Sequence, residues 1–215
     1  MARHALSVED KAARRAAILD AALALFLEDT RQLPAVSAIA RRSGLAKGTV
    51  YLYFRSKEEI FAALLTDEWE ALLAAFIAAF ETGGRDAAAA RFIAAFAGFI
   101  EERPYFLRLD SLGYALLAGT LSPDSFWSFK VHFAEAVARA GKSADAALQL
   151  PAGRGQALLT RSYALVRGLW QLADVPDALR DNPLYVTHRL APADFAEALR
   201  ASLSEYWRGA LASAG

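Results

Sequence analysis

The segment SGLAKGTVYLYFRSK, residues 43–57, carries side chains suited to contact phosphate groups. Its lysines are cationic, and its threonine and tyrosine hydroxyls can donate hydrogen bonds to phosphate oxygens. These residues are Lys47, Thr49, Tyr51, Tyr53 and Lys57. Gly48 stands among them without a side chain, so another surface could approach the backbone closely there. The group as a whole favours a polyanionic partner.

Charge is distributed unevenly along the chain. The 215 residues contain 24 Lys and Arg against 24 Asp and Glu, so the net charge is zero. Residues 31–57, however, contain six basic residues and no acidic residue. A local positive patch on a neutral chain is typical of a nucleic-acid-binding surface. Charge alone leaves open the alternative of a solvated helix face that binds nothing.

Apolar residues recur at helical spacing along almost the whole chain, which predicts an all-α fold without strands. Capping boxes are expected at Ser7 with Asp10 and at Ser56 with Glu59. The predicted helices are one that starts at Ser7, a short one that Gly44 ends, and others over about 47–54, 57–81, 86–102, 105–118, 123–140, 153–173 and 192–212. The longest irregular stretch is expected at 174–183.

The two short helices on either side of Gly44 form a helix-turn-helix pattern. On a helix over 47–54, Val50 and Phe54 face inward, whereas the glycine and threonine near its start face outward. Tyr51 and Tyr53 lie about 200° apart on that helix, so they cannot both belong to the core. A helix that presents its first half in this way suits the major groove of DNA and the flanking phosphates.

Residues 17–64, with ILDAALALF followed by VSAIARRSGLAKGTVYLYFRSKEEIF, resemble the DNA-binding domain of the TetR family of transcriptional regulators. The resemblance implies a homodimer in which each subunit places the 47–54 helix into one half-site of a double-stranded DNA operator. It also implies an N-terminal helix-turn-helix domain of three helices at 1–60. The helical body at 61–215 would then bind a small-molecule effector and form the dimer.

The resemblance assigns candidate DNA contacts by motif position. They are Lys47, Gly48, Thr49, Tyr51, Tyr53 and Lys57. Three positions depart from the family pattern: Thr30 replaces a glycine that usually ends the first helix, Ala35 a threonine cap and Ala46 a serine cap. An uncapped helix start costs about 1 kcal/mol, and each lost hydroxyl removes a phosphate donor. Arg42 joins the candidates because it and Arg41 could compensate electrostatically.

Two apolar stripes near the C-terminus predict a dimer interface. Further apolar residues lie off each stripe, more than one internal face requires, which together with the resemblance favours a four-helix bundle built from two helices of each subunit. The candidate interface residues are Leu158, Leu165, Leu169, Leu199, Leu203 and Tyr206. The alternative is burial of both stripes within one subunit.

Aromatic residues are frequent between 92 and 133, where they could line an effector pocket or fill an ordinary core. Polar residues on the apolar stripes favour a pocket, because a buried carboxylate at Asp110 would need a partner such as Arg108, Arg167 or a ligand. The candidate pocket residues are Phe96, Phe106, Asp110, Tyr114, Trp127, His132, Arg167 and Trp170. We expect a mainly hydrophobic or aromatic effector that acts on DNA affinity through the long helix at 57–81.

Several function classes are disfavoured by the composition. Cysteine is absent, the three histidines lack metal-binding spacing, and no nucleophile or phosphate-loop motif occurs, so we expect no enzyme, no metal and no cofactor. The N-terminus lacks a secretory signal and no apolar run could span a bilayer, which predicts a cytoplasmic protein without a membrane partner.

The sequence therefore predicts a ligand-responsive, sequence-specific DNA-binding transcriptional regulator, and the usual family direction is a repressor released by its effector. The alternatives are a structural dimer that has lost DNA binding and an all-α enzyme.

Overall fold

The computed structural model describes residues 8–120, 122–180, 182–188, 192 and 194–212, without the side chains of 114–120, 125 and 177. All regular elements in these ranges are helices and none is a strand, which confirms the all-α prediction. The chain divides into two compact units, one built from residues up to 69 with 108–131, and one from 70–107 with 132 onward. No helix among the described residues is long and apolar enough to cross a membrane.

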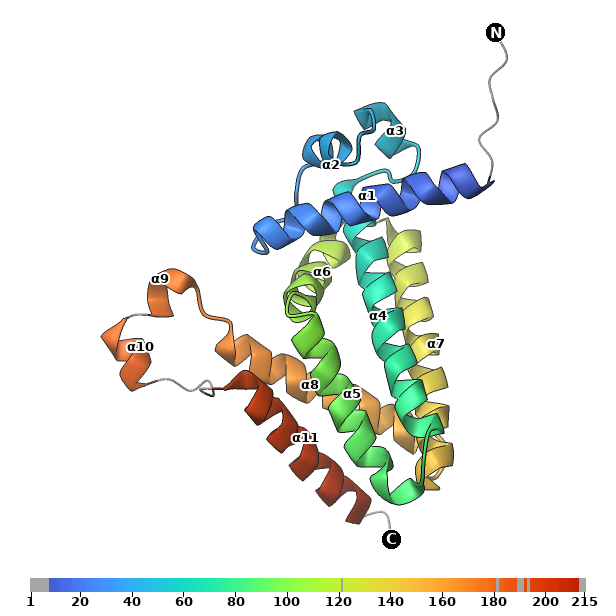
Figure 1. Ribbon diagram of the computed structural model, residues 1–215, viewed down its shortest axis with the longest axis vertical. Coiled ribbons are helices and arrows are strands. Elements are labelled where there is room, and N and C mark those ends of the chain that lie inside the picture. The colour runs from blue at the N-terminus through green and yellow to red at the C-terminus, as the bar shows by residue number, and fades with distance from the viewer. Residues whose placement is uncertain (1–7, 121, 181, 189–191, 193, 213–215) are drawn as a thin grey trace. The chain divides into compact units, whose positions relative to one another are not determined.

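The first unit begins with three helices that precede a long one (Figure 1). They are α1 (Val8–Glu28), α2 (Val36–Arg42), α3 (Lys47–Tyr51) and the first half of α4 (Lys57–Glu81). This unit also contains most of α6 (Phe106–Thr120) and the first residues of α7 (Pro123–Leu148). Ser7, the expected cap of the first helix, lies outside the described residues.

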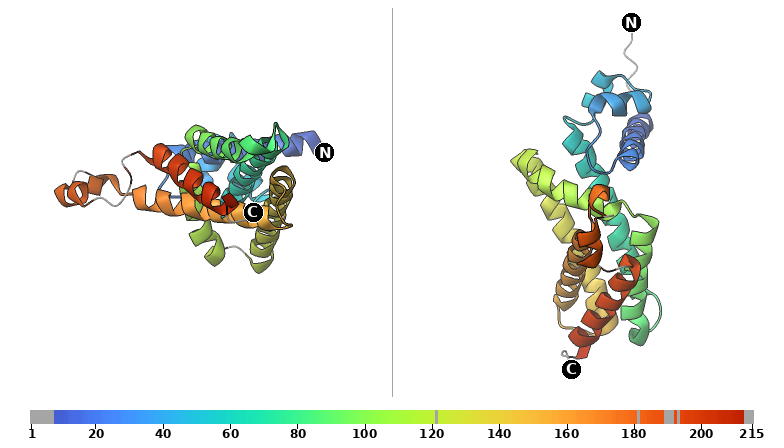
Figure 2. Two further views of the ribbon diagram at one scale, coloured as in Figure 1. Left: turned by 90° about the horizontal axis from the view of Figure 1, so that it is seen from below. Right: turned by 90° about the vertical axis from the view of Figure 1, so that its left-hand side faces the viewer.

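The second unit contains the remainder of α4 and α7 and the helices toward the C-terminus. These are η1 (Arg85–Ala87), α5 (Ala88–Glu102), α8 (Arg154–Ala173), α9 (Asp177–Arg180), α10 (Pro183–Thr187) and α11 (Phe195–Ala212). Helix α11 packs on both α8 and α5, and α8 and α11 lie side by side in Figures 1 and 2.

The core of the first unit forms where apolar faces of α1, α2 and α4 meet. Ile18, Phe26 and Ile39 are fully buried, and the Phe26 ring meets the Phe61 ring edge-on with centroids 5.8 Å apart. Burial of such side chains stabilises the unit by about 1.5–3 kcal/mol each. The core thus fixes α2 on α1.

A capping interaction starts α4 at the predicted place. The backbone N–H of Glu59 donates to Ser56 Oγ at 3.2 Å, as the capping box requires. The Glu59 carboxylate accepts from the backbone N–H of Arg55 at 2.8 Å, one residue before the expected partner. Both bonds satisfy donors near the start of α4.

Aromatic rings fill the core of the second unit. Phe92 lies centrally, with its ring centroid 4.6 Å from Phe76, 5.5 Å from Phe80 and 4.7 Å from Trp207. The indole Nε1 of Trp207 donates to Ser162 Oγ at 2.9 Å, which joins α11 to α8. Helices α4, α5, α8 and α11 therefore share one core in this unit.

Helix α7 continues to Leu148, eight residues beyond the predicted end at 140. The predicted helix stopped just before Gly141, but this glycine lies inside α7 where α8 crosses it. A Cβ at Gly141 would lie 2.6 Å from the backbone nitrogen of Gln156, and one at Gly155 would overlap the carbonyl oxygen of Gly141. The two glycines permit a close helix crossing, so they mark a contact and not a helix end.

The region expected to be irregular, 174–183, contains short helical turns. Helix α9 covers Asp177–Arg180, and α10 starts at Pro183 after Asn182, whose Oδ1 accepts from the backbone N–H of Leu184 at 2.9 Å. The Asn cap followed by Pro at the first helical position explains this start.

Candidate DNA interface and ligand cavity

The turn between α2 and α3 is fixed by Gly44. Its φ of +70° is in the left-handed region that favours glycine. The backbone N–H of Leu45 bonds back to the carbonyl of Ala40 at 3.0 Å, which ends α2 in a Schellman motif. This turn sets α3 at an angle to α2, as the helix-turn-helix prediction requires.

Helix α3 is shorter than predicted and ends at Tyr51 instead of 54. The backbone N–H groups of Tyr53 and Phe54 both bond to the carbonyl of Val50 at 3.0 Å, which tightens the chain after the helix. Val50 is fully buried and Phe54 is 6% exposed, so the predicted inward anchors are confirmed.

The candidate DNA contacts lie on or near one exposed surface of the first unit. Lys47, Gly48 and Tyr51 are exposed, whereas Thr49, Tyr53 and Lys57 are half-buried. The Nζ of Lys47 lies 5.8 Å from the centroid of the Tyr51 ring, so this cation and this phenol occupy the same part of the surface.

Nothing in the described chain requires a glycine at position 48. A Cβ added to Gly48 would meet no atom within 4 Å, and its φ lies outside the left-handed region. Glycine inside a helix costs about 0.5–1 kcal/mol relative to alanine. Because Gly48 is exposed, its missing side chain leaves the surface of α3 open to close approach by another molecule.

The arginines beside this surface differ in their partners. The guanidinium of Arg42 pairs with Glu28 at 2.8 Å, and both side chains are exposed. Arg41 is exposed and forms no ion pair among the described residues, so it is the freer of the two cations, although only Arg42 was predicted as a contact. The guanidinium of Arg15 in α1 lies 5.5 Å from the centroid of Phe54, which brings a further cation toward the end of α3. The spacing of residues in the sequence did not indicate that Arg15 lies near this surface.

The three departures from the family pattern have distinct structural consequences. Ala35 and Ala46 stand at the N-cap positions of α2 and α3 with extended backbone and no side-chain cap bond. After α1, Asp29 accepts hydrogen bonds from the backbone N–H of Arg31 at 3.0 Å and from Gln32 Nε2 at 2.7 Å. These bonds, the one from Arg31 more than the one from Gln32, hold the pKa of Asp29 below its ordinary value. This turn organises the end of α1 without a left-handed glycine at Thr30.

A cavity of about 520 Å³ lies in the second unit. It is lined by Ala97, Ile100, Glu101, Pro104, Leu107, Trp170, Ala173, Asp174, Arg180, Asp194, Phe195, Ala196 and Leu199. These residues come from α5, α6, α8, α9 and α11 and from adjoining turns. The volume and the mixture of apolar, aromatic and charged walls suit a small molecule.

The predicted pocket residues only partly coincide with this cavity, because Trp170 lines it whereas Phe96 and Phe106 do not. Phe96 and Phe106 are fully buried, packed against Phe76 at 5.0 Å and Phe99 at 5.3 Å between ring centroids. Large rings fill space, so the open volume lies beside their smaller neighbours Ala97 and Leu107.

Asp110 is 6% exposed, as expected for a buried carboxylate, and Trp69 is one of its partners. The indole Nε1 of Trp69 donates to Asp110 Oδ1 at 3.2 Å. Asp110 therefore has a role in the core of the first unit that needs no effector.

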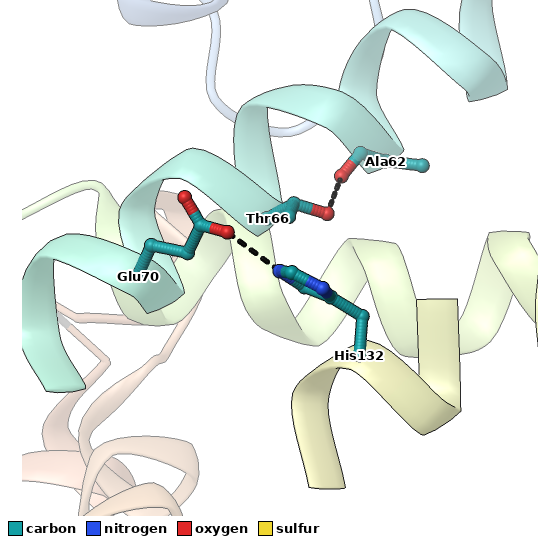
Figure 3. A network of polar contacts seen from close by, with 4 residues as sticks. All are labelled: Ala62, Thr66, Glu70 and His132. Carbon is teal, nitrogen blue, oxygen red and sulfur yellow. Dashed lines mark hydrogen bonds and ion pairs between the residues drawn. The ribbon is translucent and has the colours of Figure 1, made fainter. Parts of the chain in front are cut away.

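Two predicted pocket residues lie on the surface. Trp127 is 64% exposed in the first unit. In the second unit His132 Nε2 lies 2.5 Å from Glu70 Oε1, with both side chains exposed (Figure 3). Figure 3 also shows Thr66 Oγ1, which donates to the Ala62 carbonyl within α4 at 2.8 Å. Neither Trp127 nor His132 is enclosed as the pocket prediction required.

Of the remaining two predicted pocket residues, one lies outside this cavity and the other has a side chain that the structure does not describe. Arg167 is half-buried and does not line the cavity, and the side chain of Tyr114 lies outside the described residues.

The predicted dimer residues fall into two groups. Leu158, Leu199 and Leu203 are at most 1% exposed within this chain, because α8 and α11 pack on each other. These three side chains have no exposed surface left for a second chain. For them the alternative stated above, burial within one subunit, holds. Leu165, Leu169 and Tyr206 are half-buried and remain candidates.

Two protein-family models match the chain. Residues 18–64 match the bacterial regulatory proteins of the tetR family, and residues 66–214 match the tetracyclin repressor-like C-terminal domain. The second match alone covers more than half of the chain.

One relative is similar in sequence to part of the chain. The fatty acid metabolism regulator protein of Bacillus subtilis (strain 168) is 41% identical over 51 residues, which are 24% of this chain and 26% of that relative. The chain thus matches about a quarter of that relative's length.

Solved structures are similar over much more of the chain. A putative transcriptional regulator from Pseudomonas aeruginosa PAO1 has a TM-score of 0.63 at 15% identity, covering 97% of this chain and 95% of that one. A TetR family transcriptional regulator from Thermus thermophilus has a TM-score of 0.52 at 23% identity, covering 89% and 97%. At these identities the similarity concerns the fold.

Proposed function

Because the chain belongs to the TetR family of bacterial regulatory proteins, we propose that it is a ligand-responsive, sequence-specific DNA-binding repressor. Helix α3 enters the major groove of an operator half-site, and a small hydrophobic or aromatic effector releases the protein from DNA. Such a regulator works in the cytoplasm, where bacterial DNA lies.

The observation that carries the DNA-binding proposal is the exposed glycine of α3. Gly48 serves no packing purpose in the described chain, yet it lies between exposed Lys47 and half-buried Thr49 on a segment without acidic residues. A close backbone approach to DNA gives this glycine a purpose. Lys47, Tyr51, Tyr53 and Lys57 then contact flanking phosphates.

Arg41 and Arg42, beside this surface, extend the proposed contact with DNA. Arg41 approaches phosphate without first breaking an ion pair, whereas Arg42 must exchange its bond to Glu28. A surface ion pair is worth only about 0–1 kcal/mol, so DNA can displace it. Both arginines therefore serve as electrostatic contacts.

We propose the 520 Å³ cavity as the effector site. Trp170 and Phe195 supply aromatic surface, and Ala97, Ala173 and Ala196 leave the space that larger side chains would fill. Effector and operator influence each other only if they prefer different arrangements of one element. Helix α4 is the candidate element, because its residues 57–69 belong to the first unit and 70–81 to the second.

The DNA-binding proposal is tested by Gly48→Ala. The operator is first selected by gel shift from random duplexes. Because the substitution adds a favourable helix residue, the free energy of unfolding rises by about 0.5–1 kcal/mol. The added methyl group obstructs the approach of DNA. Overpacking of this kind costs about 1–3 kcal/mol, so operator affinity falls about tenfold or more.

Gly98→Ala is the matched control. Gly98 lies inside α5, and a Cβ there would also meet no atom within 4 Å. This variant gains similar stability and keeps its operator affinity. Undiminished operator binding by Gly48→Ala would contradict the proposed docking of α3.

A second candidate function, a structural dimer without DNA binding, is favoured by the missing cap hydroxyls at Ala35 and Ala46. Salt dependence separates the two. If six to eight phosphates are neutralised per dimer, log affinity falls against log salt with a slope of about −5 to −7. A flat response would favour the structural dimer.

A further inference from the structure

Leu52 places an apolar side chain in solvent at the end of α3. It is 82% exposed, and among large hydrophobic residues of the described chain only Val8, at the start of α1, is more exposed. Its backbone is held in helical conformation and its N–H bonds to the Thr49 carbonyl at 3.1 Å. The side chain is therefore presented outward from a fixed backbone.

Folding does not account for this leucine. Val50 and Phe54 anchor the segment, at 0% and 6% exposure. A single exposed leucine is ordinary on a protein surface. What distinguishes Leu52 is its position four residues after Gly48, which places both on the same helix face.

We infer that Leu52 reads the 5-methyl group of a thymine in the operator. This inference rests on the proposed function, in which the Gly48 face of α3 lies in the major groove. The thymine methyl is the one apolar group that a base pair of unmodified DNA presents there, and the other groups are hydrogen-bond donors and acceptors. Leucine has no group to bond with those, and covering them would remove their water without compensation.

The consequence is specificity for thymine at one base pair of each half-site. Lysine and tyrosine contacts with phosphate hold α3 in place but carry no direct sequence information. Leu52 adds a contact that depends on the base.

The experiment replaces each thymine of the selected operator, one at a time, by deoxyuridine, which lacks only the 5-methyl group. At the position read by Leu52, removal of one buried methyl weakens binding by about four- to tenfold per half-site. Thymines elsewhere respond less.

Leu52→Ala completes the test. This variant keeps the thermal stability of the native chain, because the side chain is mostly exposed. It binds the thymine operator about as weakly as the native chain binds the deoxyuridine operator, and it becomes insensitive to that replacement. Leu184→Ala, which changes a 70% exposed leucine in α10, keeps full sensitivity.

Two outcomes would overturn the inference. Affinity could be insensitive to every deoxyuridine, or Leu52→Ala could keep the native sensitivity. If Leu52→Ala keeps that sensitivity while losing affinity equally for all duplexes, Leu52 contacts deoxyribose and not the thymine methyl group. In each case the operator is still bound, so the proposed function stands; failure to select any operator would contradict the function itself.

Discussion

At the scale of residues, the two buried polar side chains of the described chain share one explanation. Asp110 and Ser162 are 6% and 0% exposed, and each accepts a hydrogen bond from a tryptophan indole. A buried indole N–H needs an acceptor, and these residues supply it. The polar positions within apolar stripes therefore reflect pairing inside each unit.

The bond between Ser162 and Trp207 gives the first prediction. Ser162→Ala leaves the buried Trp207 N–H without its acceptor, so the free energy of unfolding falls by about 1–3 kcal/mol. Urea denaturation measures this change. Ser204→Ala is the control, because Ser204 also bonds to a carbonyl four residues earlier but is not fully buried. Equal stability of the two variants would show that the indole bond contributes nothing.

At the scale of elements, the crossing of α7 and α8 depends on two glycines and one carboxylate. Gly141 and Gly155 allow backbone contact, and the Asp145 carboxylate accepts from the N–H groups of Gly153 at 2.7 Å and Gly155 at 2.5 Å. An acidic acceptor is favourable at the start of a helix. The crossing therefore joins the end of α7 to the start of α8.

Gly155→Ala tests this crossing. Its new Cβ would overlap the Gly141 carbonyl oxygen and lie 2.8 Å from Ala144 Cβ, so the helices must separate. We expect a net loss of about 1–3 kcal/mol in the free energy of unfolding, despite alanine's better helix propensity. Thermal denaturation beside Gly98→Ala, which should gain stability, measures the difference. A Gly155→Ala chain as stable as the native one would mean that the crossing relaxes freely.

The uncapped start of α3 gives a prediction of the opposite sign. Ala46 has φ −67° and ψ 145°, the extended conformation of an N-cap residue, but no side-chain acceptor. Ala46→Ser supplies one and raises the free energy of unfolding by about 1 kcal/mol, measured by urea denaturation. Ala74→Ser, at an exposed interior position of α4, lowers stability slightly because serine is the poorer helix former. Similar changes in both variants would exclude a cap.

At the scale of the whole molecule, the proposed repressor depends on pairing of two chains, since a symmetric operator requires two recognition helices at a fixed spacing. On α8, half-buried Leu165 and Leu169 lie beside exposed Ala164 and Gly168. These apolar and small residues of α8 remain accessible after α11 has packed on Leu158, so we propose them as part of the dimer contact.

Ala164→Glu tests this face. A carboxylate meeting its symmetry mate would weaken the dimer by more than about tenfold, because unpaired buried charge is costly. Analytical ultracentrifugation measures dimer dissociation, and circular dichroism checks that helix content is kept. Ala78→Glu, at an exposed site of α4, should leave association unchanged. An undisturbed Ala164→Glu dimer would place the contact on another face.

Local features of the fold followed from the sequence by itself. Helical periodicity predicted the all-α class. Gly44 predicted the end of α2, and the Ser56 cap predicted the start of α4. Val50 and Phe54 predicted the inward side of α3. These features depend on residues a few positions apart, whose geometry is set by the backbone of one or two helices. The roles proposed for the DNA contacts remain predictions.

Only the tertiary structure decided which apolar faces meet. The same leucine stripe could face a neighbouring helix or a second chain, and packing of α11 on α8 placed Leu158, Leu199 and Leu203 inside. Trp69 donates a hydrogen bond to Asp110 across 41 residues of sequence, and Gly141 lies at a crossing point with α8. Periodicity shows that a face is apolar, but the surface that covers it is set by contacts between residues far apart in the chain.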